Sequence, residues 1–287
     1  MRKRRAKTFR AAYLILVFSF MYVPIAVMAV FSFNQSKSRT VFTGFTLDWY
    51  KNLFQNEMIL KSLALSLVVA FISASIATVI GTMASIGINN MKRGTRSLVL
   101  NISYMPVINP EIVTGVSLML LFVVYKNMAN GFLQKLGGQD GAMLRVFGLA
   151  TLLIAHITFC LPYVIFNVSP KLKQMDVRMY EAALDLGCNP RQAFFKVVLP
   201  EIMPAVLSAF LICLTYSIDD FIISYFTSGT MQTLPIAIYS MTRKKVSPEI
   251  NALSTIMFVV ILSIILILNA ADSHMEKRQS SKSSFTN

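Results

Sequence analysis

The sequence predicts an all-α polytopic membrane protein with six transmembrane helices. Of its 287 residues, 55% are hydrophobic, and the mean hydropathy of +0.61 is far too high for a soluble domain of this size. Each of six apolar runs is near the ~20 residues that cross a bilayer core. The runs cover residues 11–33, 62–88, 97–125, 148–169, 203–227 and 251–271. An even number of spans leaves both termini on one side.

The first run is predicted to be a retained membrane anchor. It is too long for the core of a signal peptide, and no small-x-small cleavage pattern follows Phe31. The residues before it include Arg2, Lys3, Arg4, Arg5, Lys7 and Arg10. The positive-inside rule therefore predicts that both termini are cytoplasmic. The expected organisation is a basic cytoplasmic N-terminus at 1–10, a transmembrane domain at 11–271 with its core at about 61–271, and a cytoplasmic tail at 272–287.

The net charge of +14 indicates membrane topology rather than nucleic-acid binding. Basic residues stand in short loops beside predicted helix ends, as Lys92, Arg93 and Arg96 do. The sequence has no basic groove with interleaved aromatic residues, which nucleic-acid recognition would need. One basic run, Arg243 to Lys245, is predicted to lie outside the cell and breaks the trend.

The second and third apolar runs differ in their expected packing. In the second run, Ala70, Ala74 and Thr78 recur at a spacing of four residues, and small side chains let helices approach closely in lipid. In the third run, Pro106 and Pro110 predict a kinked or broken start, with the helix proper beginning near Pro110.

Two adjacent carboxylates, Asp219 and Asp220, lie within the fifth apolar run. Each Asp near a helix centre costs about 2.5–3.5 kcal/mol to insert, whereas an apolar residue returns only about 0.3–0.6 kcal/mol. Such residues are functional candidates by default. Tyr216 lies three and four residues before the pair and shares its side of a helix, so the group fits a pathway for a cation.

Other interpretations of these acidic residues stay open. The Asp pair can instead cap a broken helix or bond neighbouring hydroxyl groups. A proteolytic dyad is disfavoured because adjacent helical residues point about 100° apart. Glu111, the second acidic position, either caps the start of its helix or lines the path toward the cytoplasm.

A histidine and three cysteines in the sequence are interpreted as packing residues. His156 stands alone in an apolar helix, where a hydrogen-bonded packing role is commoner than proton relay or ligand binding. Cys160, Cys188 and Cys213 have no CxxC spacing and no nearby His, so they predict buried small hydrophobes or a free loop thiol rather than a metal or redox site.

A polar stretch at 176–200, between the fourth and fifth apolar runs, predicts two short amphipathic helices at a sharp turn. Asp176 can cap the first helix, and Gly187 can take the left-handed conformation that ends it. Asn189-Pro190 then starts the second helix. Such a hairpin is a rigid surface that a soluble protein can grip.

The spacing in this stretch resembles the "EAA" coupling loop of permease subunits of bacterial ABC importers. Glu181-Ala182-Ala183, then Gly187, then Leu199-Pro200 follow that pattern. In that family the first helix of the loop docks into a groove on the ATP-hydrolysing subunit. The resemblance implies that these residues, Glu181, Ala182, Ala183, Gly187, Leu199 and Pro200, couple the chain to an ATPase.

Further blocks make the chain similar to the C-type permease subunit of spermidine/putrescine ABC importers. They are residues 156–162, 176–179, 181–187, 217–221 and 246–253. The resemblance implies a type I ABC importer permease fold in the bacterial cytoplasmic membrane. It implies three kinds of protein partner: a second permease subunit, two ATP-binding subunits and an extracytoplasmic polyamine-binding protein. It also implies that a polyamine passes the residues Asp219, Asp220, Tyr216 and Glu111 during transport.

The sequence contains no P-loop, so this chain is expected to be a transport subunit and not an enzyme. No cofactor or metal is expected on it, and ATP and Mg²⁺ would be used by the partner ATPase. The alternatives are an ABC permease for another small solute, an ion-driven secondary transporter, a membrane scaffold without transport activity, or an intramembrane enzyme. Neither spermidine nor putrescine is favoured over the other by the residues.

Overall fold

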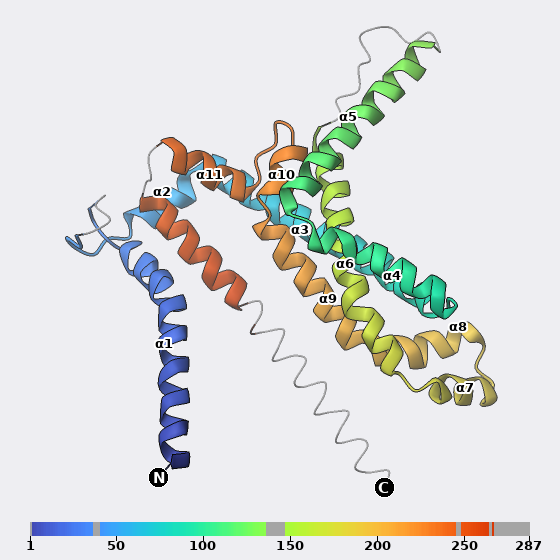
Figure 1. Ribbon diagram of the computed structural model, residues 1–287. Helices are drawn as coiled ribbons and strands as arrows, with labels where there is room; N and C mark the ends of the chain where they lie inside the picture. Colours follow the sequence, from blue (N-terminus) through green and yellow to red (C-terminus); the bar gives the residue numbers. More distant parts are fainter. Residues whose placement is uncertain (1, 37–40, 136–146, 245–247, 264–265, 267–287) are drawn as a thin grey trace. The chain divides into compact units, whose positions relative to one another are not determined.

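The computed structural model describes residues 2–36, 41–135, 147–244, 248–263 and 266, and most of them are helical (Figure 1). The elements are α1 (Arg2–Phe31), α2 (Asp48–Gln55), α3 (Glu57–Asn89), α4 (Arg93–Ile108), α5 (Glu111–Lys135), α6 (Leu149–Gln174), α7 (Val177–Asp185), α8 (Pro190–Ala193), the π-helix η1 (Phe194–Val198), α9 (Leu199–Asp219), α10 (Ile222–Thr227) and α11 (Leu234–Lys244). A further apolar helix covers Pro248–Ser263.

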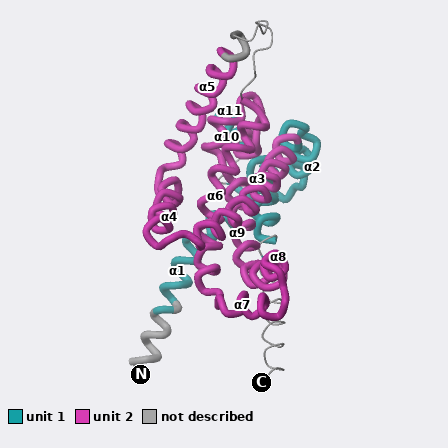
Figure 2. Tube along the Cα trace, turned by 90° about the vertical axis from the view of Figure 1, so that its right-hand side faces the viewer, with its two compact units in different colours: residues 1–60, 238–287 teal, residues 61–237 magenta. Residues whose placement is uncertain are grey.

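The chain divides into two compact units (Figure 2). Unit 1 consists of residues 1–60 and 238–287, and unit 2 consists of residues 61–237. Unit 2 contains all the residues that the sequence singles out as candidate sites, so the remaining description concentrates on it.

In unit 1, aromatic contacts hold α2 against the segment that follows α1. The ring of Phe33 stacks on the rings of Phe45 and Tyr50, with centroids 5.3 and 5.2 Å apart. An antiparallel bridge joins Asn34 to Phe45, and the Trp49 indole N–H donates to the Asn34 carbonyl over 2.7 Å. These contacts form a small ordered cap after the first long helix.

The prediction of an all-α membrane protein is confirmed. Five helices in the described part of the chain are long and apolar enough to cross a membrane: Ala12–Phe31, Glu57–Asn89, Glu111–Gly131, Leu149–Gln174 and Pro190–Asp219. The sixth predicted span, 251–271, is described mainly through the shorter helix Pro248–Ser263, and most of the rest of it lies outside the described residues.

Two of the predicted spans are broken. The break in the third run was expected, and a break at the Asp pair was one of the interpretations that the sequence left open. The third run divides at Asn109 and Pro110, so that α5 begins at Glu111 as the prolines predict. The fifth run, predicted to span residues 203–227, is also divided, which agrees with the interpretation that the Asp pair caps a broken helix. Its helix α9 ends at Asp219, and the short helix α10 begins at Ile222. The physical cause of this second break is described with the site below.

Helix α6 lies at the centre of unit 2, and its faces contact several neighbouring helices. Toward α9, the thiols of Cys160 and Cys213 each point at the backbone carbonyl of the other residue, at 3.8 and 3.5 Å. Toward α4, Ile165 packs with Leu100 and with Ile88 from α3 in one buried cluster. Cys160 and Cys213 are therefore buried packing residues, as the sequence predicts.

Small side chains bring α3 close to α6. Ala70 and Ala74 on α3 are fully buried, which confirms the close packing that their spacing predicts. A Cβ added to Gly81 would lie 2.6 Å from the Cβ of Val164 on α6. Only glycine therefore fits at this crossing.

We expect Gly81→Ala to destabilise the protein, because the added methyl group overlaps a buried β-branched side chain. Overpacking of this kind costs roughly 1–3 kcal/mol. Gly87→Ala on the same helix is the matched control, since nothing lies within 4 Å of its added Cβ. It should be neutral or stabilising by up to ~1 kcal/mol. The measurement is thermal unfolding of the purified chain in detergent, and equal unfolding temperatures for the two variants would contradict the close crossing.

Candidate functional site

The polar stretch at 176–200 folds into a helical hairpin, which we call the coupling hairpin. Its first helix, α7, is capped by Asp176, whose carboxylate Oδ1 accepts the Arg178 N–H over 3.0 Å. The helix ends at Gly187, which has φ +86°. The Gly187 N–H donates to the Leu184 carbonyl and the Cys188 N–H to the Ala183 carbonyl, which is the Schellman arrangement. The predictions for Asp176 and Gly187 are confirmed.

The second helix of the coupling hairpin begins as predicted at Asn189-Pro190. Asn189 and Gln192 form a reciprocal capping box, with N–H to side-chain distances of 2.9 and 3.1 Å. The helix then widens into the π-helix η1, in which the Leu199 N–H bonds the Phe194 carbonyl. Pro200 follows directly and has no N–H for the usual i→i−4 bond, so a wider turn accommodates its ring.

An ion pair closes the base of the coupling hairpin. Lys171, in the last turn of α6, donates from Nζ to Glu201 Oε1 on the first turn of α9 over 2.9 Å. Both side chains are about two-thirds buried. The hairpin therefore leaves and re-enters the helical bundle at two points that are held together.

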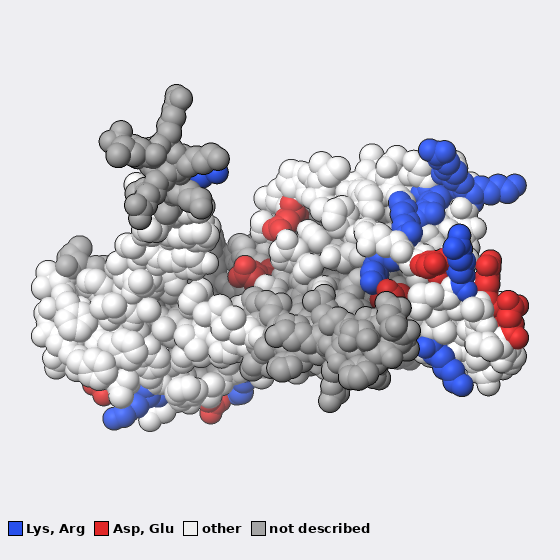
Figure 3. All heavy atoms as spheres, turned by 90° about the horizontal axis from the view of Figure 1, so that it is seen from below, with Lys and Arg blue, Asp and Glu red and all other residues white. Residues whose placement is uncertain are grey.

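The outer surface of the coupling hairpin mixes charge with exposed apolar side chains. Figure 3 shows many Lys, Arg, Asp and Glu side chains on the right-hand side of the view, over the part of unit 2 where α7, α8 and the start of α4 lie in Figure 1. The large apolar residues exposed on the hairpin are Val177, Met179, Leu186 and Phe195. Solvated apolar residues among charges are typical of a protein-docking surface.

The residues predicted to couple to an ATPase divide between this surface and the interior of the hairpin. Glu181, Ala182, Gly187 and Pro200 are exposed, and Leu199 is half-buried. Ala183 is only 8% exposed, so its side chain lies inside the hairpin and does not belong to its outer face. Ala193 is also fully buried, and the two small side chains allow the helices of the hairpin to approach closely.

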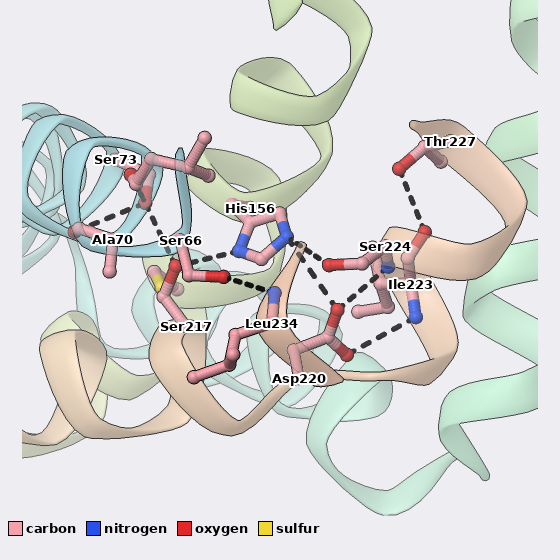
Figure 4. Close-up of polar contacts among 12 residues, drawn as sticks. Ser66, Ala70, Ser73, His156, Ser217, Asp220, Ile223, Ser224, Thr227 and Leu234 are labelled. Atoms are coloured by element: carbon pink, nitrogen blue, oxygen red, sulfur yellow. Dashed lines mark hydrogen bonds and ion pairs between the residues drawn. The ribbon is translucent and has the colours of Figure 1, made fainter. Parts of the chain in front are cut away.

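The Asp pair is divided between two environments. Asp220 is 8% exposed and caps α10 with both carboxylate oxygens. Oδ1 accepts the Ile223 N–H over 3.1 Å, and Oδ2 accepts the Ser224 N–H over 2.7 Å (Figure 4). This is the capping role that the sequence left as an alternative to a pathway role, and it explains why the fifth run is broken.

His156 on α6 bridges the break between α9 and α10 (Figure 4). Its Nδ1 lies 2.6 Å from the Ser217 hydroxyl on α9, and its Nε2 lies 3.0 Å from the Ser224 hydroxyl on α10. The same Nε2 is 3.6 Å from Asp220 Oδ2. Ser217 continues the network to Ser73 on α3 over 3.2 Å. His156 is therefore a hydrogen-bonded packing residue, as predicted.

Asp219 is exposed, as is Tyr216, which precedes it by one helical turn. The Tyr216 ring lies against Tyr163 and Phe159 of α6, with centroids 4.8 and 6.3 Å apart. We call Phe159, Tyr163 and Tyr216 the aromatic group. Glu111 is exposed at the first position of α5. Tyr216 thus belongs to the aromatic group and Asp219 follows it by one turn of α9, whereas Asp220 is held in the buried polar network.

Sequence reasoning missed Phe159 and Tyr163. Their spacing of four residues places both on one face of α6, and that spacing was the available signal. The partnership of this face with Tyr216 depends on how α6 packs against α9, which the sequence pattern does not specify. The bridging role of His156 was missed for the same reason.

Comparison with known proteins identifies the family of the chain. Residues 77–281 match the model of the binding-protein-dependent transport system inner membrane component. The chain belongs to this family. It is therefore a membrane component of a transport system, which agrees with the prediction of a permease subunit that is not an enzyme.

Named relatives of this transport component cover most of its length. The spermidine/putrescine transport system permease protein PotC of Haemophilus influenzae is 34% identical over 90% of this chain and 94% of its own. The putrescine transport system permease protein PotI of Escherichia coli strain K12 is 36% identical over 86% and 84%. PotC of the same strain is 36% identical over 90% and 91%.

The fold of this component resembles that of a bacterial ABC transporter for alginate. A crystal structure of that importer aligns with a TM-score of 0.69 and 18% identity, over 96% of both chains. Its complex with a periplasmic protein carrying an alginate pentasaccharide aligns with a TM-score of 0.70 and 19% identity, over 93% of this chain and 94% of the other. At this identity the likeness establishes the fold alone, and the predicted ABC importer permease fold is confirmed.

Replacement of the two aspartates should affect stability very differently. Asp220→Ala leaves two backbone N–H groups of α10 without their acceptor, so we expect a loss of about 2–6 kcal/mol, since each buried group left unpaired costs about 1–3 kcal/mol. Asp219→Ala removes an exposed carboxylate and should change stability by less than ~0.5 kcal/mol. Thermal unfolding in detergent compares the two, and an equal loss in both would mean that Asp220 does not hold the break.

Proposed function

We propose that this chain is a permease subunit of an ATP-driven importer for polyamines such as spermidine and putrescine. The observation that carries this proposal is the match, across nearly the whole chain, to relatives named for the transport of these two compounds. The chain forms half of the translocation pathway and couples it to a separate ATPase. The residues around the aromatic group support the same cargo.

Polyamines carry ammonium groups on flexible apolar chains, and the aromatic group suits both features. Aromatic faces attract cations with about 0.5–2 kcal/mol, more when water is excluded. In this proposal the carboxylates of Asp219 and Glu111, both of which are exposed, offset charges in transit. In this proposal the cation contacts Tyr216 and Asp219, and Asp220 acts on the cargo only by fixing the helix end on which Asp219 stands.

The coupling hairpin is the proposed joint to the ATPase. Its exposed apolar residues are unusual outside a membrane or an interface, and the chain itself has no P-loop. Hydrolysis of ATP with Mg²⁺ therefore belongs to two ATP-binding subunits. A second permease subunit and an extracytoplasmic polyamine-binding protein complete the assembly. The crystal structure of the alginate transporter with its periplasmic protein supports an assembly of this general kind.

The orientation follows from the basic residues. Arg2 to Arg10 at the N-terminus and the Lys171 to Lys196 region then face the cytoplasm, together with the coupling hairpin. Both termini are cytoplasmic in this arrangement. Transport proceeds by alternating access, in which closure of the ATPase dimer moves the hairpin and reorients the helices around the pathway.

Substitution of Gly187 tests the coupling hairpin. A β-branched residue at φ +86° is strained by roughly 1–2 kcal/mol. The effect is conformational, since nothing lies within 4 Å of an added Cβ. We expect Gly187→Val to reduce co-purification with the ATPase subunits, whereas Gly187→Asn, which tolerates this conformation, should retain most of it. Normal co-purification of the Val variant would remove the support for this turn as part of the joint.

Substitution of Tyr216 and Asp219 tests the pathway. Uptake of labelled spermidine and putrescine is measured in proteoliposomes that contain the complete assembly. Asp219→Asn and Tyr216→Ala should lower uptake several-fold, because each removes a group that offsets the ammonium charge. Asp219→Glu and Tyr216→Phe are the controls, since they keep the charge and the ring.

If the Asp219→Asn and Tyr216→Ala variants take up polyamines at the wild-type rate, this path is excluded. Absence of polyamine uptake by the intact wild-type assembly would instead favour another small solute. Uptake that persists without the ATPase subunits would favour an ion-driven transporter.

A further inference from the structure

The corner between α3 and α4 concentrates positive charge that has no acidic partner among the described residues. Lys92 and Arg93 are exposed at the start of α4, and Arg96 follows one turn later. Within the described ranges of the chain, none of the three forms an ion pair. The corner lies outside the aromatic group and the coupling hairpin, and the proposed transport function makes no use of it.

The N-terminus of α4 adds further donors at this corner. Lys92 occupies the N-cap position and makes no side-chain capping bond. The first N–H groups of a helix of 16 residues therefore lack a side-chain acceptor. Nothing lies within 4 Å of the position where Gly94 would carry a Cβ, so the space beside this first turn is open. Helix N-termini of this kind attract anions.

Arg96 directs its guanidinium toward the end of α3. Its Nη2 donates to Asn89 Oδ1 at the end of α3 over 2.7 Å. Its Nε is buried and has no hydrogen-bond partner among the described residues. An unpartnered donor on a charged group is costly in a buried place, because no water replaces the missing acceptor. The unpaired Nε of Arg96 therefore indicates a place for a hydrogen-bond acceptor that the described residues do not supply.

Ser169 on α6 supplies a second buried donor without a partner. The residue is 4% exposed, and its hydroxyl makes no hydrogen bond to the described part of the protein. Ile165 packs against Leu100 in one cluster. Ser169 lies one turn after Ile165, and Arg96 lies one turn before Leu100. Successive spans run in opposite directions, so α4 and α6 are antiparallel. The step from Ile165 to Ser169 on α6 and the step from Leu100 to Arg96 on α4 therefore both lead toward the α3–α4 corner.

The donors at the corner match the acceptors of a phosphate group. A phosphate presents several oxygens, and N–H groups of arginine, a helix N-terminus and a hydroxyl are its usual partners. The other face of α4 indicates the source of the phosphate. Leu98, Ile102 and Met105 recur at helical spacing and are each more than half exposed, so they form an apolar stripe suited to acyl chains. The basic residues stand just before that stripe in the chain, and Lys and Arg beside a membrane attract anionic lipid headgroups.

We propose that the α3–α4 corner binds the phosphate of an anionic phospholipid. Arg96 and Ser169 hold the phosphate from the buried side, and Lys92, Arg93 and the α4 N-terminus hold it from the membrane surface. The apolar stripe of α4 carries the acyl chains. The site fixes the end of α4 against α3 and α6, and it is independent of the cargo.

The test uses the full chain purified with its native partner subunits from membranes that contain phosphatidylglycerol. Retained lipid is measured by native mass spectrometry after exchange into detergent. Wild-type protein should retain phosphatidylglycerol in preference to phosphatidylcholine. Arg96→Gln should lose it several-fold, and Ser169→Ala, which keeps the packing, should also lose it. Lys173→Gln is the matched control, because it makes the same charge change at an exposed position of α6.

The outcomes separate the sources of the phosphate. Equal retention by Arg96→Gln and the wild type would overturn the proposal, as would an equal loss in Arg96→Gln and Lys173→Gln, which indicates diffuse attraction to the membrane. In a second arm, inorganic phosphate is added to delipidated protein, and its effect on thermal unfolding is compared with that of short-chain phosphatidylglycerol. Stabilisation by the lipid alone supports the proposal, whereas equal stabilisation by inorganic phosphate overturns the assignment to a lipid. If Arg96→Gln does not fold, the lipid retained by Ser169→Ala decides the test: loss supports the proposal, and wild-type retention overturns it.

Discussion

The carboxylate of Asp220 resolves the main conflict in unit 2, which is a helix that stops inside an apolar segment. A bilayer offers no water to the backbone groups that such a stop releases, so the protein must supply their partners. Both oxygens of Asp220 accept N–H groups of the first turn of α10. His156 then bonds one hydroxyl on each side of the break. The position of α10, and with it the contact between Gly115 on α5 and Phe226, depends on this arrangement.

The same arrangement gives the adjacent aspartates separate tasks. Both carboxylate oxygens of Asp220 accept backbone N–H groups, so this buried side chain has its hydrogen-bond partners inside the protein. Asp219 is the last residue of α9 and is exposed beside Tyr216. In a continuous helix, both carboxylates would face different sides with the same poor solvation. The break therefore allows one carboxylate to build the structure while the other is available to a cation.

The sequence predicted those features that short-range signals determine. Asp176, Gly187 and Asn189-Pro190 act on backbone groups within a few residues of themselves, so the coupling hairpin followed from local rules. Pro110 predicted the break before α5 in the same way. The break at Asp220 has no proline, and it depends on His156, which lies 61 and 68 residues before its serine partners. The burial of Ala183 likewise depends on how the two helices of the hairpin pack.

The coupling hairpin is held rigid both by local capping bonds and by contacts between residues far apart in the sequence. Its turn is fixed by the Schellman bonds at Gly187, and its second helix continues through η1 directly into α9. The Lys171–Glu201 pair ties that second arm to α6 at the base. In the proposed assembly, a displacement applied to the hairpin by an ATPase would therefore be carried along α9 toward Asp219 rather than absorbed in a loop. Since α9 ends there, the helix that bears the hairpin also bears the carboxylate proposed to contact the cargo.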